Sequence, residues 1–176
     1  MTPVAEPPAG ATARLFLALW PDEPATLQGL RAWQAALRWP ASARPTAAAN
    51  LHLTLHFIGA VPRERLAEVA DGLRVPAVHT DITLSEWTVW PHGVAVLAPR
   101  AVPAALLELH GRLAERLAAL QLPVDTRPWR PHATLARRAA GAALAGAPPA
   151  PVTWPVRQGH VLAESASGYH LLRRYA

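Results

Sequence analysis

Two histidines stand in nearly the same short motif. His52 opens His-Leu-Thr-Leu and His132 opens His-Ala-Thr-Leu, each within an apolar run. The ordinary pKa of imidazole is about 6.5, so near neutral pH one ring can accept a proton while another donates one. A threonine hydroxyl can donate a hydrogen bond to an oxygen on which negative charge gathers. Two such pairs facing each other would suit general acid–base catalysis at a phosphodiester.

The apolar residues around each motif alternate with polar ones, which is typical of a strand. Alternate side chains of a strand face opposite ways, so we expect His52, Thr54 and His56 on one face and the leucines between them in the core. His132 and Thr134 should likewise share a face. The Cα atoms of each His-Thr pair would lie about 6.5 Å apart, so both side chains could reach one small anion.

His52 and His56 could also be read as a zinc-binding pair. The spacing His-x-x-x-His places two ligands together on a helix, but this segment alternates like a strand, and the sequence contains no HExxH motif. Cysteine is absent, which excludes thiolate ligands and disulfides. We therefore predict no metal and no cofactor.

The same order of elements occurs twice along the chain. A strand, a helix and a second strand that bears the motif follow one another in each half, and 38 positions separate Arg14 from His52 and also Val94 from His132. Repeated order at matched spacing indicates an internal duplication. The expected strands are 14–21, 51–59, 81–90, 93–99, 129–137, 155–165 and 168–176, and the expected helices begin near Pro24, after Asp22 as a possible N-cap, at Pro62 and at Pro103.

The composition indicates one globular domain. The chain has 176 residues, of which 51% are hydrophobic, and we expect residues 1–12 to be a disordered tail and 13–176 a single bilobal domain. All 17 basic residues are arginine and the formal net charge is +5, which favours a phosphate-bearing partner. The sequence has no signal-peptide pattern and no membrane-spanning run, so we expect a cytoplasmic protein that makes no membrane contact. We also expect a monomer.

The motifs and their surroundings resemble the two-histidine phosphoesterases. The matching segments are HLTL with its continuation HFIG, RPWRPHATLAR, VLAESASGYHLLRRYA and the opening RLFLALWPDE. Within that superfamily they most resemble the LigT-like (ThpR) RNA 2′,3′-cyclic phosphodiesterases, over nearly all of Arg14–Tyr175. The resemblance implies a bilobal α+β fold, with two pseudo-symmetric antiparallel sheets and outer helices around a central cleft.

The resemblance also implies an activity and a set of roles. It implies metal-independent hydrolysis of 2′,3′-cyclic phosphates at RNA ends to 2′-phosphomonoesters, reversible as a 2′-5′ RNA ligase, with RNA ends or nucleotide cyclic phosphates as partners. On that analogy His52 is the acid that protonates the departing 3′-oxygen and His132 is the base that activates water, although the sequence alone does not decide which histidine has which role. Thr54 and Thr134 hold the phosphate, Arg137 aids its binding, and Phe57 stacks on a base. Strict alternation turns Phe57 and Arg137 away from the histidines unless each strand bulges, twists or ends there.

Two other readings remain open. The protein could bind RNA ends without catalysis, or act by the same chemistry on an ADP-ribose cyclic phosphate or a 2′,5′-linked oligoadenylate. No role is predicted for the other residues that could carry chemistry, since Arg127 and Arg130 suit solvated positions and Tyr169 and the tryptophans suit packing. The histidines without a predicted role are His79, His92, His110, His160 and His170.

Overall fold

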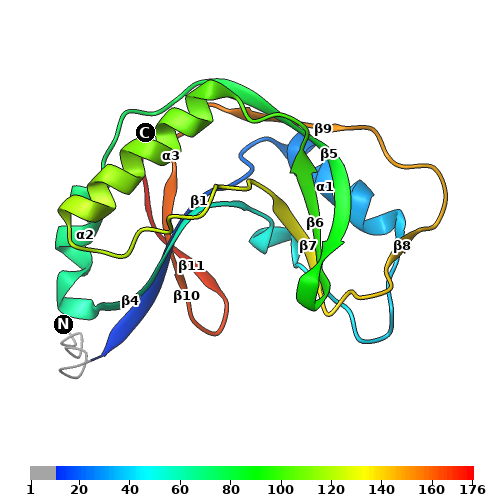
Figure 1. The fold of residues 1–176 in the computed structure, drawn as a ribbon, viewed down its shortest axis with the longest axis horizontal. Coiled ribbons are helices and arrows are strands. Elements are labelled where there is room, and N and C mark those ends of the chain that lie inside the picture. Colours follow the sequence, from blue (N-terminus) through cyan, green and yellow to red (C-terminus); the bar gives the residue numbers. More distant parts are fainter. Residues whose placement is uncertain (1–10) are drawn as a thin grey trace, which may run out of the picture.

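An antiparallel sheet forms the body of the protein in the computed structural model, which describes residues 11–176 (Figure 1). Its strands run in the order β11-β10-β1-β4-β7-β6-β5-β9, with the short β3 also paired to β7, while β2 and β8 pair separately. The strands are β1 (Thr12–Leu19), β2 (Leu37–Arg38), β3 (Arg44–Pro45), β4 (Leu53–Pro62), β5 (Thr80–Trp90), β6 (Val94–Pro99), β7 (Ala133–Arg137), β8 (Ala143–Leu144), β9 (Val152–Val156), β10 (Val161–Ser165) and β11 (Tyr169–Arg174).

The sheet consists of two halves that meet at one residue pair. β11-β10-β1-β4 form one half and β7-β6-β5-β9 the other, and between β4 and β7 only Leu53 and Ala133 are in register (Figure 1). The α+β class and the two antiparallel units predicted from the sequence are confirmed. The two sheets are joined into a single curled one.

Between residues 11 and 176, three helices cover the sheet, together with three short 3-10 turns. The helices are α1 (Pro24–Ala35), α2 (Leu66–Gly72) and α3 (Ala104–Ala119), and the turns are η1 (Ala48–Asn50), η2 (Arg63–Arg65) and η3 (Pro91–Gly93). The unit β1-α1-β4 repeats as β6-α3-β7. Each helix of the repeat crosses to the other half, because α1 packs on β9 and β7 whereas α3 packs on β4. The crossing helices interlock the two halves.

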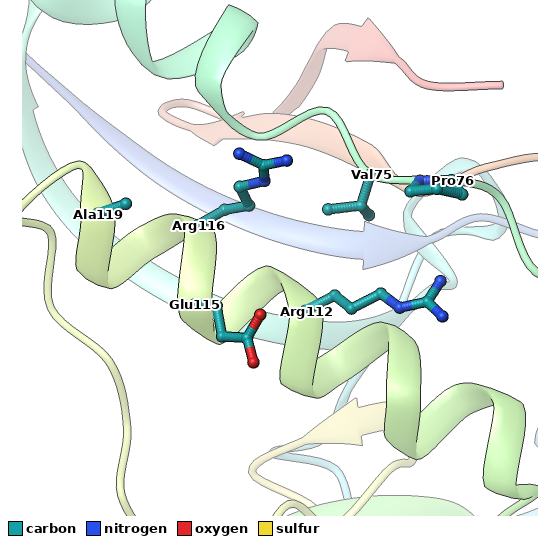
Figure 2. A pocket seen from close by; sticks show the side chains of 6 residues that line it. All are labelled: Val75, Pro76, Arg112, Glu115, Arg116 and Ala119. Carbon is teal, nitrogen blue, oxygen red and sulfur yellow. The ribbon is translucent and has the colours of Figure 1, made fainter.

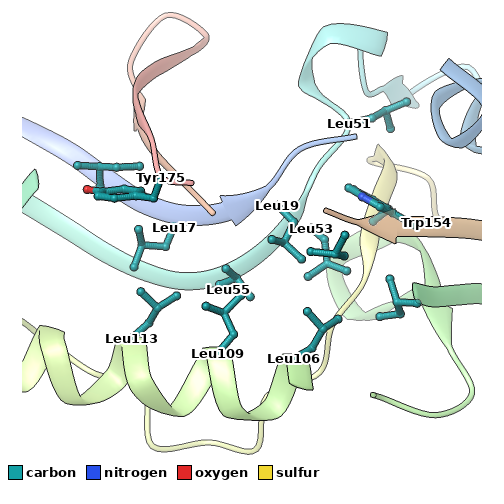
Figure 3. Close-up of a cluster of buried hydrophobic side chains, with 14 of the residues drawn as sticks. Leu17, Leu19, Leu51, Leu53, Leu55, Leu106, Leu109, Leu113, Trp154 and Tyr175 are labelled. Atoms are coloured by element: carbon teal, nitrogen blue, oxygen red, sulfur yellow. The ribbon is translucent and has the colours of Figure 1, made fainter. Parts of the chain in front are cut away.

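The apolar stripe of α3 forms the centre of the core. Leucines at helical spacing along α3 are fully buried and point at the leucines of β1 and β4 (Figure 3). The side chains in this contact are Leu106, Leu109 and Leu113 on α3 and Leu17, Leu53 and Leu55 on the strands.

The start of α1 differs from the expectation at its cap. Pro24 occupies the first turn as predicted, but Glu23 is the N-cap residue and makes no side-chain cap. Asp22 instead pairs with Arg174 at 2.8 Å, which ties the start of α1 to β11.

The C-terminal strands also differ from the expectation. The segment 155–165, expected as one strand, is split between β9 and β10, which lie in opposite halves of the sheet. Between them Gly159 packs against the backbone of Tyr175 so closely that a Cβ atom would collide with its carbonyl oxygen. Only glycine fits this close approach, which lies in the segment where the chain crosses from β9 to β10.

The first strand begins slightly earlier than expected. Residues 1–10, which make up most of the expected tail, lie outside the described residues, and β1 begins at Thr12. Between residues 11 and 176, no helix is both long enough and apolar enough to cross a membrane.

Candidate active site

The residue pair that joins the two halves also positions both histidines. Leu53 and Ala133 are fully buried, and they are the first residues of β4 and β7. His52 directly precedes Leu53, and His132 directly precedes Ala133. The neighbours of a buried strand residue face the opposite side. His52, Thr54, His132 and Thr134 are therefore brought to one face of the sheet, where all four are half-buried.

Both histidines make the same backbone contact. Nδ1 of His52 lies 2.7 Å from the carbonyl oxygen of Asn50, and Nδ1 of His132 lies 2.7 Å from that of Arg130. A carbonyl oxygen only accepts hydrogen bonds, so Nδ1 must carry a hydrogen and donate it. The Nε2 atom of each neutral ring is then free to take up a proton. Nε2 of His52 lies 3.1 Å from Oγ1 of Thr54.

A β-bulge follows the threonine in each half. In β4, Thr54 is opposite Ala18 and His56 is opposite Leu17, which leaves Leu55 as the extra residue. In β7, Thr134 is opposite Val96 and Ala136 is opposite Ala95, which leaves Leu135 as the extra residue. One extra residue reverses the alternation of the side chains after it.

The bulges bring the predicted binding residues to the histidine face. Phe57 pairs with Phe16, whose ring centroid is 5.2 Å from that of His52, and Phe57 itself is 66% exposed. Arg137 is exposed at the end of β7, and its charge acts on both histidines. Strict alternation would have turned both side chains away.

The same bulge turns His56 away from the site. Its ring is buried on the opposite face, 3.9 Å from the ring of His110 on α3, and its Nε2 donates to the His110 carbonyl oxygen at 2.9 Å. The expectation that His56 shares the face of His52 is therefore wrong, and the two rings cannot bind one zinc ion together. Within the described part of the chain, no three His, Asp or Glu side chains are grouped to hold a metal.

Aromatic residues that the sequence reading assigned to packing surround His52. Trp20 stacks on its ring at 4.7 Å with an interplanar angle of 17°, and Tyr169 meets it edge-on at 5.1 Å. Trp20 follows the last residue of β1 and Tyr169 begins β11, and both are far from the motif in sequence. In the sequence they are recognisable only as aromatic residues. That does not distinguish a ring buried in the core from a ring in a functional site.

His132 has different neighbours. The ring of Trp90 lies 4.4 Å from its ring, and the guanidinium of Arg130 lies over the same indole at 4.6 Å. Arg130 is exposed, as predicted, and it also contacts the site through Trp90. Arg127 is exposed as well, but it pairs with Asp125 at 2.6 Å.

Comparison with known proteins identifies the family of the chain. The family model of the 2′-5′ RNA ligase superfamily matches residues 20–165. The chain belongs to this superfamily. A protein of Escherichia coli (strain K12) named RNA 2′,3′-cyclic phosphodiesterase is 35% identical over 146 residues, which cover 80% of each chain.

Solved structures of this superfamily share the fold. The crystal structure of E. coli LigT in apo form matches with a TM-score of 0.79 and 31% identity, and covers 94% of this chain and 97% of that one. The structure of E. coli LigT complexed with 3′-AMP matches with a TM-score of 0.78 and 31% identity, and covers 94% and 98%. The resemblance to LigT-like proteins inferred from the motifs is confirmed.

The electrostatics of the site in this superfamily member favour an anion. Burial lowers the pKa of His52 to about 4, against the hydrogen bond to Asn50, and it is lowered further by His132 when that ring is protonated and by the positive charge of Arg137. Burial also lowers the pKa of His132, as do the nearby Arg130 and Arg137. Both rings are therefore neutral near pH 7 in the free protein. A bound phosphate would reduce the positive potential and raise both pKa values.

A separate hollow lies on the outside of α3. It has a volume of about 330 Å³ and lies between that helix and Val75 and Pro76, with Arg112, Glu115, Arg116 and Ala119 along it (Figure 2). None of the predicted site residues lines it. The site predicted from the two motifs therefore lies elsewhere on the molecule than this hollow.

Proposed function

We propose that the protein is an RNA 2′,3′-cyclic phosphodiesterase, which opens a cyclic phosphate at an RNA end to leave a 2′-phosphomonoester. One observation carries this proposal. Two histidines from equivalent strands have Nδ1 fixed by a backbone carbonyl at the same 2.7 Å distance, and each has a threonine two positions on. The 35% identical relative named for this activity supports the choice of substrate.

We assign the base to His132 and the acid to His52. Nε2 of His132 takes a proton from water as the water oxygen bonds to phosphorus. The bond from phosphorus to the 3′-oxygen breaks, and Nε2 of His52 donates a proton to that oxygen. The aromatic rings around His52 and the nearby exposed ring of Phe57 favour this side for the ribose and base of the leaving group.

The remaining site residues would stabilise charge. In this proposal the hydroxyls of Thr54 and Thr134 donate to the non-bridging oxygens, and Arg137 adds a positive charge beside both histidines. Substrate must displace the contact between Thr54 and Nε2 of His52 that exists in the free protein. With hydroxyls, arginine and imidazolium in place, we propose that the reaction needs no metal.

The test is turnover of a 2′,3′-cyclic mononucleotide in the presence of EDTA. We expect the 2′-phosphate as product, and we expect His52→Ala and His132→Ala each to lower kcat/KM by about 10²- to 10⁴-fold. His79→Ala, which removes an exposed imidazole elsewhere, is the matched control and should behave as the parent. Turnover that survives both substitutions would contradict the mechanism.

The same experiment separates the alternatives. Binding of the cyclic nucleotide without turnover by the parent protein would favour an RNA-end-binding protein instead. Loss of activity with EDTA would show that a metal takes part. A monomeric state and a cytoplasmic location remain predictions, the first of which sedimentation equilibrium would test.

A further inference from the structure

We propose that Trp90 and Arg130 form a binding site for a second nucleoside, the one that carries the 5′-oxygen of a 2′,5′ linkage. This inference rests on the proposed function and adds to it a place for an alcohol that attacks or leaves on the His132 side. The site is the outward surface of the guanidinium that lies over the indole, next to the ring of His132.

The direction of the reaction places this nucleoside. In an in-line displacement at phosphorus, the attacking and leaving oxygens lie on opposite sides. With the leaving 3′-oxygen at His52, the incoming oxygen lies at His132. When that oxygen belongs to water, nothing more is bound there. When it belongs to the 5′-hydroxyl of a nucleoside, its ribose and base must lie beside His132, where Trp90 and Arg130 are found.

Trp90 and Arg130 have the features of a stacking surface. Trp90 is half-buried at the end of β5, just before the turn η3, so its backbone is fixed by pairing with Val94. The guanidinium of Arg130 lies 4.6 Å from the indole centroid, and its side chain is exposed. Bases stack on aromatic rings and on arginine planes in single-stranded RNA recognition.

The charge of Arg130 is also available to a ligand. Eight arginines of residues 11–176 pair with a carboxylate, but neither Arg130 nor Arg137 is among them. A free guanidinium beside a phosphate site can donate hydrogen bonds to phosphate oxygens as well as stack. The backbone carbonyl of Arg130 accepts a hydrogen bond from Nδ1 of His132. The stacking surface is therefore held close to His132, the proposed general base.

The two halves differ here although their motifs match. His52 is enclosed by Trp20, Phe16 and Tyr169, whereas His132 has an indole covered by an exposed arginine. Duplicated catalytic groups with unlike surroundings indicate that unlike parts of the substrate lie on the two sides. A side that admitted only water would not need a stacking surface.

The step that uses this site is balanced. The 5′-oxygen of the second nucleoside bonds to phosphorus, the bond to the 3′-oxygen breaks, His132 accepts the 5′-hydroxyl proton, and His52 donates a proton to the 3′-oxygen. The product is a 2′,5′-phosphodiester with a free 3′-hydroxyl. The reverse reaction cleaves such a linkage to a 2′,3′-cyclic phosphate and a nucleoside with a 5′-hydroxyl.

The experiment compares two substrates with the full chain. We would measure kcat/KM for a 2′,5′-linked diadenosine monophosphate and for adenosine 2′,3′-cyclic phosphate, and take their ratio. Arg130→Ala and Trp90→Leu should each lower the ratio about 10-fold, because only the dinucleotide has a second base to stack. Arg130→Lys keeps the charge but not the plane and should lower it as well. Arg116→Gln, an exposed arginine on α3 without an ion pair in the described chain, should leave the ratio unchanged.

Each outcome decides something. If Arg130→Ala, Arg130→Lys and Trp90→Leu all slow both substrates by the same factor, these residues act only through His132 and the second site is wrong. If the parent turns over the cyclic phosphate but not the dinucleotide, the second site is wrong while the proposed function stands. If the parent turns over neither, both are wrong. Urea midpoints equal to that of the parent would show that the variants are folded.

Discussion

At the scale of single residues, the two histidines are held alike but are not equivalent. The carbonyl contact at Nδ1 sets the same tautomer in both rings. Catalysis by one base and one acid then requires that only one ring be protonated. Since burial lowers the pKa of both rings, the protonated form is scarce near neutral pH until an anionic substrate binds.

This difference between the free and the bound protein predicts the pH dependence. The profile of kcat/KM reports the free protein, in which both pKa values lie below 6.5 and that of His52 is about 4. We expect kcat/KM to fall about tenfold for each pH unit above about 6.5, because the acid loses its proton. The negative charge of bound substrate raises the pKa of the acid, so kcat should stay level to a higher pH than kcat/KM.

Steady-state rates between pH 5 and 9 with a cyclic mononucleotide check this expectation. Arg137→Gln removes a positive charge that lowers the pKa of His52, and should therefore move the falling limb of kcat/KM to higher pH. A kcat/KM that rises between pH 6.5 and 8 would contradict the assigned protonation states.

At the scale of elements, each bulge is fixed by the helix that crosses from the other half. The carbonyl oxygen of Leu135 accepts from Nε2 of Gln34 on α1 and from the backbone N–H of Thr46, both at 2.9 Å. In the other half His56, which follows the extra residue Leu55, donates from Nε2 to the carbonyl oxygen of His110 on α3 at 2.9 Å. The crossing helices thus hold the two irregularities that direct Phe57 and Arg137 to the site.

We expect Gln34→Ala to lower both stability and activity. Two hydrogen bonds, to Thr46 and Leu135, are lost, which should lower the free energy of unfolding by about 1–3 kcal/mol. Without the bond from Gln34 to Leu135, the bulge in β7 is held less firmly and Arg137 becomes less well positioned. We therefore expect kcat/KM to fall about tenfold or more. Gln28→Ala, at an exposed position of the same helix, is the control.

Urea unfolding and cyclic-nucleotide turnover measure the two effects separately. Inorganic phosphate should also bind more weakly to Gln34→Ala, as Arg137 is displaced. A variant that loses stability but keeps full activity and phosphate affinity would show that the bulge does not depend on α1.

Much of this could be predicted from the sequence, and the bulges show why the rest could not. The motif histidines, most of the long strands and the amphipathic α3 follow from periodic patterns that the structure preserves. A bulge adds one residue to that pattern, and Leu55 and Leu135 are apolar whether or not they are the extra residue. The face of His56 therefore could not be predicted. Trp20 and Trp90 reach the histidines only through the pairing of distant strands, which a single sequence does not reveal.

At the scale of the whole molecule, the two halves share little backbone pairing but a large core. Only Leu53 and Ala133 are in register between them, while α1 and α3 each cover the other half. Neither half can unfold without exposing the helix that it receives. We therefore expect a single cooperative transition, so that a local change in protonation affects the stability of the entire chain.

Buried histidines then make the whole protein sensitive to acid. Burial lowers the pKa of five rings, those of His52, His56, His110, His132 and His160. His160 is fully buried and stacked on Tyr175, and its Nε2 donates to the Leu73 carbonyl oxygen at 2.9 Å. Its Nδ1, which must take up any proton, has no hydrogen-bond partner among residues 11–176. Protonation there would place an unpaired charge in the core, which explains a pKa of about 4.

The sign of the effect follows from the unfolded chain, where these rings titrate near 6.5. Between about pH 6.5 and 4 the unfolded chain binds more protons than the folded one, so the free energy of unfolding falls as the pH falls. Each unit of pKa difference contributes about 1.4 kcal/mol, and we expect a loss of several kcal/mol between pH 7.5 and 4.5. Urea unfolding of the parent at pH 7.5 and at pH 4.5 measures this loss.

The variant His160→Gln tests the part of the loss that comes from His160. It should be less stable than the parent at pH 7.5 but lose less free energy of unfolding on acidification, because it lacks the ring whose protonation the folded core opposes. An equal loss in parent and variant would mean that protons reach Nδ1 of His160 in the folded protein, and the C-terminal packing around Tyr175 would then have to be open to water.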